Sequence, residues 1–233
     1  MTKRKVILAT RAILFDAYGT LLDVHHVVAL AELHWPGSGE ALSTLWRDKQ
    51  LQYTWLRTLM QNYADFWQVT GDALDYAVGR LGLAMTAKAR RELMAAYESL
   101  PPFPDVRPML TTLASAGLPL AVLSNGTSPM LEKAFDAAGL RAAFVALLSV
   151  NAARSYKASP KAYQTAINAF GGVPAEFVLV SSNGWDIAGA AHFGFRTFWV
   201  NRIGAPTERL GVTPSKIGNT LAELAPWLSV DQA

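Results

Sequence analysis

The sequence contains no cysteine, which excludes disulfide bonds and thiolate chemistry. Its four histidines, His25, His26, His34 and His192, are not spaced like metal ligands. No apolar run approaches the ~20 residues that a membrane-spanning helix needs, and no block of Lys and Arg beyond the first five residues indicates nucleic-acid binding. We therefore expect neither a membrane nor a nucleic acid as partner.

The composition is that of an ordinary globular protein. The 233 residues are 51% apolar with a net charge of +3, which allows one large or two modest domains with a substantial core. The basic residues 1–5 and the apolar residues after them resemble the start of a signal peptide, but Arg11 and Asp16 interrupt the apolar stretch. We expect a cytoplasmic protein with a short N-terminal leader.

Apolar stretches and helical patterns alternate in the second half of the chain. Strands are predicted at 12–15, 118–123, 144–148, 177–180 and 197–200, and helices at 108–116, 129–138, 160–169 and 186–192. This alternation predicts an α/β fold with a parallel sheet flanked by helices. Residues 23 to 97 instead follow helical periodicity, and the Leu-Pro-Pro-Phe-Pro at 100–104 reads as a hinge. We predict a core domain of residues 1–22 and 104–233, with a helical domain of residues 23–103 inserted in it.

Polar residues follow three of the predicted strands. Asp16 follows the first strand, Ser124 and Asn125 follow the second, and Ser-Ser-Asn-Gly-Trp-Asp at 181–186 follows the fourth. The carboxyl ends of parallel strands meet at one edge of a sheet, where α/β proteins bind ligands. The pattern predicts an active site at this edge, beneath the helical insertion.

Asp16 is the candidate nucleophile. A carboxylate at the end of a buried strand is costly unless it is solvated or paired, and the turn at Gly19 lets the Thr20 hydroxyl hold it in place. Tyr18 stands two residues after Asp16, where a second Asp would create a metal-dependent phosphoryl-transfer site. We therefore expect no metal and no other cofactor.

The chain resembles the haloacid dehalogenase superfamily and, within it, the L-2-haloacid dehalogenases. The resemblance implies a Rossmann-like core with a small helical cap inserted after the first strand, as the pattern above predicts. It departs at Asp48, where the family often has Gln, and at Ala158, where Pro is common, which leaves substrate preference open. The matching segments, in the family's order, are residues 15–21, 45–47, 53–57, 123–126, 156–157 with Tyr163, and 180–186.

This resemblance implies a reaction. Asp16 would attack C2 of a short (S)-2-haloacid, expel halide and form an ester, which water would hydrolyse to an (R)-2-hydroxy acid. The catalytic residues that it implies are Asp16, Thr20, Arg47, Lys157, Tyr163, Ser181, Asn183 and Asp186. The substrate-binding residues that it implies are Ala17, Tyr18, Arg47, Leu51, Phe66, Ser124, Asn125 and Trp185.

The resemblance also assigns roles on the substrate side of the site. Arg47 would receive the halide together with Asn125 and Trp185, because developing negative charge needs donors already aimed at it. Ser124 and the backbone N–H groups of residues 17 and 18 would bind the substrate carboxylate. The apolar wall would be formed by Tyr18, Leu51, Phe66 and Trp185. The other aromatic residues of the insertion, such as Trp55 and Trp67, are expected in the core of the cap.

The remaining roles concern the nucleophile and the water. Lys157 would supply the positive charge that keeps Asp16 ionised, and Tyr163 would orient Lys157 or the substrate. Asp186 would act as the base for water, directly or through Lys157. Ser181 and Asn183 would position this water and the Asp16 carboxyl group.

Several alternatives stay open at this point. A ring-opening hydrolase of azetidine-2-carboxylate and a dehalogenase that prefers fluoroacetate fit the same residues. A phosphohydrolase would need further carboxylates, yet Tyr18 and Ser182 stand where they would lie. A non-catalytic binding protein is disfavoured because every matched polar residue is present. The resemblance further implies a homodimer, for which an apolar face of the cap would supply the interface.

Overall fold

The structure is a computed structural model in which residues 10–114 and 117–230 are described. The predicted N-terminal leader and the last two residues of the helix predicted at 108–116 lie outside this part of the chain. Within it, the strands form one parallel sheet in the order β3-β2-β1-β4-β5-β6. The strands are β1 (Ala12–Phe15), β2 (Leu120–Ser124), β3 (Ala146–Ser149), β4 (Phe177–Ser181), β5 (Arg196–Val200) and β6 (Lys216–Gly218).

Strand β1 lies at the centre of the sheet and positions the site. All four of its residues are buried apolar side chains, as expected for a strand covered on both faces. Phe15 is in register with Val122 of β2 and Val180 of β4, so Asp16 leaves the sheet between the ends of these two strands. The strand order runs outward from β1 in both directions, with β2 and β3 on one side and β4, β5 and β6 on the other. Open α/β sheets bind ligands at such a point.

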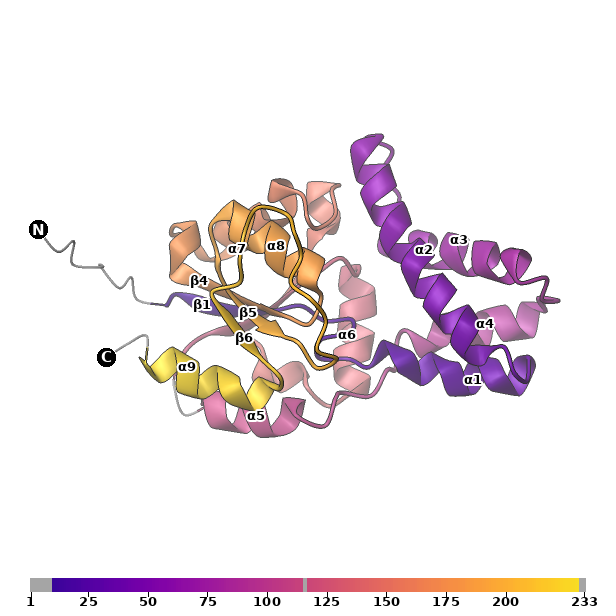
Figure 1. Ribbon diagram of the computed structural model, residues 1–233, viewed down its shortest axis with the longest axis horizontal. Helices are drawn as coiled ribbons and strands as arrows, with labels where there is room; N and C mark the ends of the chain where they lie inside the picture. Colours follow the sequence, from indigo (N-terminus) through magenta and orange to yellow (C-terminus); the bar gives the residue numbers. More distant parts are fainter. Residues whose placement is uncertain (1–9, 115–116, 231–233) are drawn as a thin grey trace, which may run out of the picture.

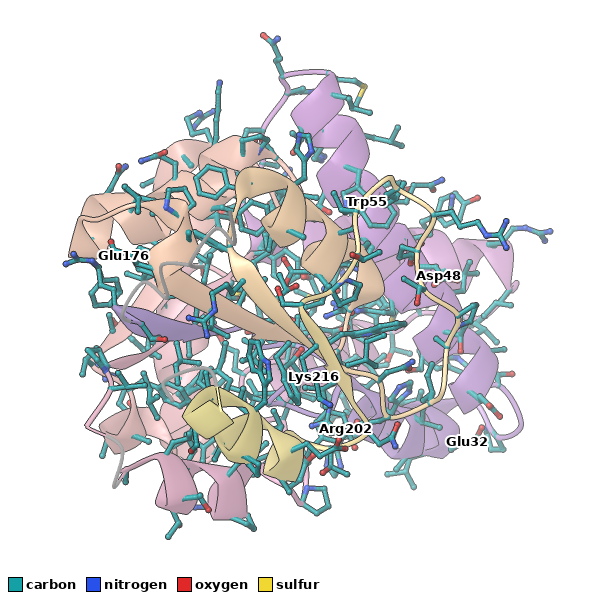
Figure 2. The ribbon with its side chains drawn as sticks, turned by 60° about the vertical axis from the view of Figure 1, so that its left-hand side comes forward. Glu32, Asp48, Trp55, Glu176, Arg202 and Lys216 are labelled. Atoms are coloured by element: carbon teal, nitrogen blue, oxygen red, sulfur yellow. The ribbon has the colours of Figure 1, made fainter. Side chains whose placement is uncertain are left out.

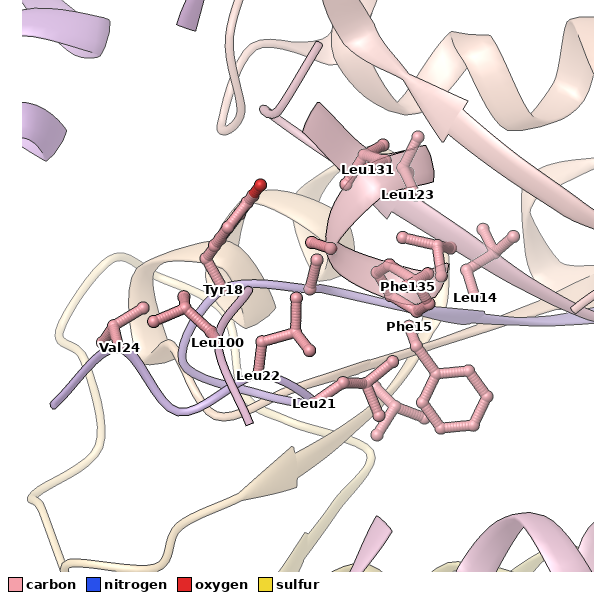
Figure 3. Close-up of a cluster of buried hydrophobic side chains, with 14 of the residues drawn as sticks. Leu14, Phe15, Tyr18, Leu21, Leu22, Val24, Leu100, Leu123, Leu131 and Phe135 are labelled. Carbon is pink, nitrogen blue, oxygen red and sulfur yellow. The ribbon is translucent and has the colours of Figure 1, made fainter. Parts of the chain in front are cut away.

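Helices cover both faces of the sheet (Figure 1). Helices α5 (Val106–Ala114) and α9 (Leu224–Val230) lie together on one face, and α7 (Pro160–Phe170) and α8 (Gly184–Phe193) lie on the other. Helix α6 (Ser128–Ala137) packs against β3. Figure 3 shows part of the resulting core, where Leu14, Phe15 and Phe135 are buried together with apolar residues of the loop after β1. The predicted α/β core with a parallel sheet flanked by helices is confirmed.

The insertion consists of helices that stand beyond the carboxyl end of β1 (Figure 1). They are α1 (Val27–His34), α2 (Gly39–Leu59), α3 (Phe66–Arg80) and α4 (Ala87–Ala96). The two connections to the sheet run side by side, with Asp23 N donating to Pro101 O at 2.9 Å and Phe103 N donating to Leu21 O at 3.0 Å. The guanidinium of Arg202 ties them to the core, because it donates to Thr20 O at 3.1 Å and to Asp105 Oδ1 at 2.9 Å. The division into two domains at these connections stays a prediction.

The structure also differs from the sequence-based expectation. Trp55 and Trp67, expected inside the cap, are 38% and 36% exposed. Strand β6 and helix α9 were not predicted, since β6 has only three residues at the edge of the sheet and α9 only seven. Within the described residues, no helix combines the length and apolar character needed to cross a membrane.

Candidate active site

The Asp16 carboxylate lies at the end of β1 and is almost fully buried, with 6% of the residue exposed. Its Oδ1 accepts a hydrogen bond from Lys157 Nζ at 3.2 Å. Its Oδ2 accepts hydrogen bonds from Asn183 Nδ2 at 2.8 Å and Thr20 Oγ1 at 2.9 Å, and a longer one from Ser181 Oγ at 3.5 Å. These donors offset the cost of burying the charge, because ionised acceptors form the stronger hydrogen bonds.

Lys157 joins two carboxylates inside the protein. Its Nζ lies 2.8 Å from Asp186 Oδ2 as well as 3.2 Å from Asp16 Oδ1, and both Lys157 and Asp186 are fully buried. Burial by itself lowers the pKa of Lys157, but the negative charges of Asp16 and Asp186 outweigh it, so the pKa is raised. The ammonium group therefore stays protonated at neutral pH.

Asp186 is held from its other side by Tyr163. The Tyr163 hydroxyl donates to Asp186 Oδ1 at 2.8 Å, and burial raises the pKa of Asp186 against the opposing effect of Lys157. Tyr163 thus contacts Asp186 directly, and it is linked to Lys157 through Asp186. Gly189 makes this approach of α7 to α8 feasible, because a Cβ there would lie 2.5 Å from the Tyr163 hydroxyl oxygen.

Arg47 reaches the site from α2. Its Nη2 donates to the backbone oxygen of Tyr18 at 3.1 Å, and its Nη1 donates to Gln50 Oε1 at 2.6 Å. Asn183 Nδ2 also lies 3.4 Å from the oxygen of Tyr18. The guanidinium therefore bridges the insertion and the loop that follows Asp16.

A small, partly open cavity of about 10 Å³ lies at these groups. Two charged side chains line it, Asp16 from the core and Arg47 from the insertion, together with an apolar wall. A burial-raised pKa keeps the Tyr18 hydroxyl neutral, so Tyr18 contributes an uncharged surface to this wall. The residues that line the cavity are Asp16, Tyr18, Arg47, Leu51, Phe66, Ser124, Asn125 and Trp185.

A wider cleft adjoins the cavity at Arg47, Leu51 and Trp185, which line both. In Figure 2, Asp48 and Trp55 lie along α2, beside the loop that begins near Arg202. Asp48, one of the two residues that depart from the family pattern, lines this cleft and not the small cavity. Trp55 packs edge-on against Trp185 with ring centroids 5.5 Å apart, so it contacts the wall of the site from outside.

The loops after β1 and β2 are held by their own hydrogen bonds. Ser124 Oγ accepts from Gly126 N at 3.1 Å, and Asn125 Oδ1 accepts from the backbone N of Lys157 at 3.0 Å. The Ala17 carbonyl accepts from the backbone N of residues 20–22 at 2.9 to 3.3 Å, which fixes the turn after Asp16. The predicted binding of a substrate carboxylate by Ser124 and the N–H groups of residues 17 and 18 stays a prediction.

Comparison with known proteins decides the family. A model of haloacid dehalogenase-like hydrolases matches residues 10–194. The chain belongs to this family. An (S)-2-haloacid dehalogenase of Pseudomonas putida is 44% identical over 216 residues, which cover 93% of this chain and 96% of the relative.

Solved structures of L-2-haloacid dehalogenases are also similar to this chain. One has a TM-score of 0.92 at 48% identity and covers 95% of this chain and 99% of its own. Another, from Xanthobacter autotrophicus with chloropropionic acid covalently bound, has a TM-score of 0.89 at 38% identity and covers 94% of this chain and 98% of its own. The predicted resemblance to this family is confirmed.

Two residues that hold side chains of the site in this dehalogenase-like hydrolase were not predicted from the sequence. Gln50 contacts Arg47, and its position three residues later on the same helix was the available signal, because such residues share a helix face. Ser182 donates from its backbone N to Thr20 Oγ1 at 2.9 Å, which orients the hydroxyl that holds Asp16. Nothing in the sequence pattern indicates this contact.

Proposed function

We propose that the protein is a hydrolytic (S)-2-haloacid dehalogenase, which converts short 2-haloacids to (R)-2-hydroxy acids and halide. The observation that carries this proposal is the Asp16 carboxylate, which lines the same small cavity as the Arg47 guanidinium and is held by four side-chain donors. A fixed carboxylate and a fixed cation in one cavity suit displacement of an anionic leaving group. The names of the similar enzymes support the same substrate class.

In the first step, Oδ1 of Asp16 attacks C2 of the substrate in line with the carbon–halogen bond. The new bond joins Oδ1 to C2, the halide leaves with the bonding electrons, and C2 is inverted. Oδ1 is the better nucleophile because Lys157 is its one side-chain donor in the described part of the chain, whereas Oδ2 has three. Arg47, Asn125 and Trp185 line the cavity where the halide would leave.

In the second step, water attacks the carbonyl carbon of the ester. The carbonyl oxygen is then Oδ2, and Thr20, Asn183 and Ser181 already donate to it. These donors would stabilise the negative charge that develops there, as in an oxyanion hole. The acyl–oxygen bond breaks, and the 2-hydroxy acid leaves.

The proton of the attacking water needs an acceptor. Both oxygens of Asp186 are occupied, by Lys157 and Tyr163, and the residue is fully buried. We therefore expect Asp186 to act through Lys157, not directly on water. The burial-raised pKa of Asp186 makes it a better proton acceptor than an exposed Asp. The proton then passes to the hydroxyl oxygen of the product.

We also propose that the reaction is independent of metal. Lys157 Nζ occupies the space between the two carboxylates, at 3.2 Å and 2.8 Å, where a divalent cation would bind. An ammonium donor at this place repels such a cation, and the neutral Tyr18 stands where phosphohydrolases carry a second acid.

Assembly and location are further parts of the proposal. Leu56, Leu59 and Met60 at the end of α2 are 41%, 78% and 62% exposed, and this apolar surface supports a homodimer formed through the cap. The cytoplasmic location stays a prediction.

The test is halide release from (S)- and (R)-2-chloropropionate, chloroacetate and fluoroacetate, each with and without EDTA. We expect release from the S isomer, unaffected by EDTA, and its loss in Asp16→Asn with the fold intact by circular dichroism. Wild-type rates in that variant would refute the mechanism. If no compound releases halide, the dehalogenase proposal is wrong, and azetidine-2-carboxylate is the next substrate to test.

A further inference from the structure

A chain of buried polar groups runs through the insertion and ends at Arg47. Gln50 lies one helical turn after Arg47 on α2 and is fully buried. Its Oε1 accepts from Arg47 Nη1 at 2.6 Å, and its Nε2 donates to Thr70 Oγ1 of α3 at 2.8 Å. Buried polar side chains need such partners. Only one end of this series of hydrogen-bonded groups, at Arg47, lines the cavity.

The direction of the Gln50 amide is set by α3. Thr70 Oγ1 uses its hydrogen on the Phe66 carbonyl at 2.6 Å, so it offers Gln50 only an acceptor. The amide N must therefore face Thr70, which leaves the amide O facing Arg47. The opposite orientation would place the amide N against the guanidinium N, and these are both donors.

The surroundings hold Gln50 in place. Trp46 Nε1 donates to the Thr70 carbonyl at 2.8 Å, and the ring of Trp46 packs on Tyr97 with centroids 4.8 Å apart. The Gln50 amide lies near the Tyr97 hydroxyl and lowers the pKa of Tyr97 against the larger, opposite effect of burial. Because the other terminal nitrogen of Arg47 binds the Tyr18 carbonyl, the guanidinium is fixed at both ends.

We propose that Gln50 is a positioning residue, which holds the Arg47 guanidinium at the place where the halide leaves. The proposal rests on the proposed dehalogenase function and adds a residue to it. Donors stabilise a developing charge most when they are already oriented, and Arg otherwise has many rotamers to lose. Replacing Gln50 by an apolar residue keeps the positive charge of Arg47 but no longer fixes the orientation of its guanidinium.

The experiment compares kcat/KM for (S)-2-chloropropionate and (S)-2-bromopropionate in wild type, Gln50→Met and a control, Gln52→Met. Gln52 is exposed on the same helix, where it accepts from Lys49 Nζ. This constant reports the steps through halide departure and not ester hydrolysis. We expect about a tenfold loss for the chloro substrate in Gln50→Met and a smaller loss for the bromo substrate, because chloride needs more stabilisation as it leaves. The control should keep both wild-type values.

Inhibition by added bromide gives a second readout. It should weaken in Gln50→Met, and also in Gln50→Leu, which likewise removes the acceptor from Arg47 and adds no charge. The second variant decides the question if Gln50→Met does not fold. An unchanged substrate ratio with unchanged bromide inhibition, or an equal loss on both substrates that follows a lower melting temperature, would overturn the proposal. Absence of halide release in wild type would instead overturn the proposed function.

Discussion

Replacing Lys157 by Met tests whether the buried cation holds the site together. The substitution leaves Asp16 and Asp186 close to one another with no cation between them, and neither is solvated. Removing one partner of a buried ion pair costs about 3–5 kcal/mol of the free energy of unfolding. At about 2–4 °C per kcal/mol for a chain of this size, the melting temperature should fall by about 6–20 °C.

The pH dependence of this loss follows from the charges that remain. Burial already raises the pKa of Asp186, and without Lys157 only the hydrogen bond from Tyr163 opposes that effect. A carboxyl group with a raised folded-state pKa stabilises the protein below that pKa, so Lys157→Met should recover part of its deficit as the pH falls from 8 to 5. In wild type, the raised pKa of Lys157 stabilises the protein at neutral pH, and this contribution is lost only as the pH rises above about 10.4.

The assay is thermal unfolding by circular dichroism at pH 8 and pH 5, with Lys161→Met as the matched control. Lys161 is exposed on α7, four residues from Lys157, and should tolerate the change. Halide release in Lys157→Met should fall at least about 100-fold, because the charge beside Asp16, the proposed nucleophile, is gone. A melting temperature within about 2 °C of wild type, or a deficit that is the same at both pH values, would refute the reasoning.

Three further predictions follow from other parts of the structure. Gly189→Ala should lower the free energy of unfolding by about 1–3 kcal/mol, although Ala favours helix, because its Cβ would lie 2.5 Å from the Tyr163 hydroxyl oxygen. Denaturant unfolding measures this change, and a gain in stability would contradict the close packing. The kcat/KM for (S)-2-chloropropionate should stay high until the pH exceeds about 10.4, because the pKa of Lys157 is raised; a decline centred near pH 8 in the pH–rate profile would show that another group controls the reaction. Leu59→Glu should convert the proposed homodimer to a monomer in size-exclusion chromatography with light scattering, because it places charge on the apolar end of α2. A wild type that is already monomeric would rule out the proposed dimer.

The sequence alone was enough to predict the class of fold and to place Asp16 at the end of its first strand. The apolar run of β1 ends at Asp16 because a central parallel strand is buried on both faces and only its end can accept a charge. The polar residues after β2 and β4 follow the same rule, so their convergence could be expected from the order of strands. These features depend on local pattern, which the sequence carries directly.

Contacts between distant residues were decided only by the tertiary structure. Lys157 stands 141 positions from Asp16 in the chain, and no local pattern shows that its ammonium lies between Asp16 and Asp186. The exposure of Trp55 could not be predicted either, because an aromatic residue favours burial but the packing of its helix decides which face is covered. The direction of the Gln50 amide depends in turn on a hydroxyl from another helix. Sequence patterns record what each segment prefers by itself, whereas hydrogen-bond direction, burial and ion pairing arise only when segments meet.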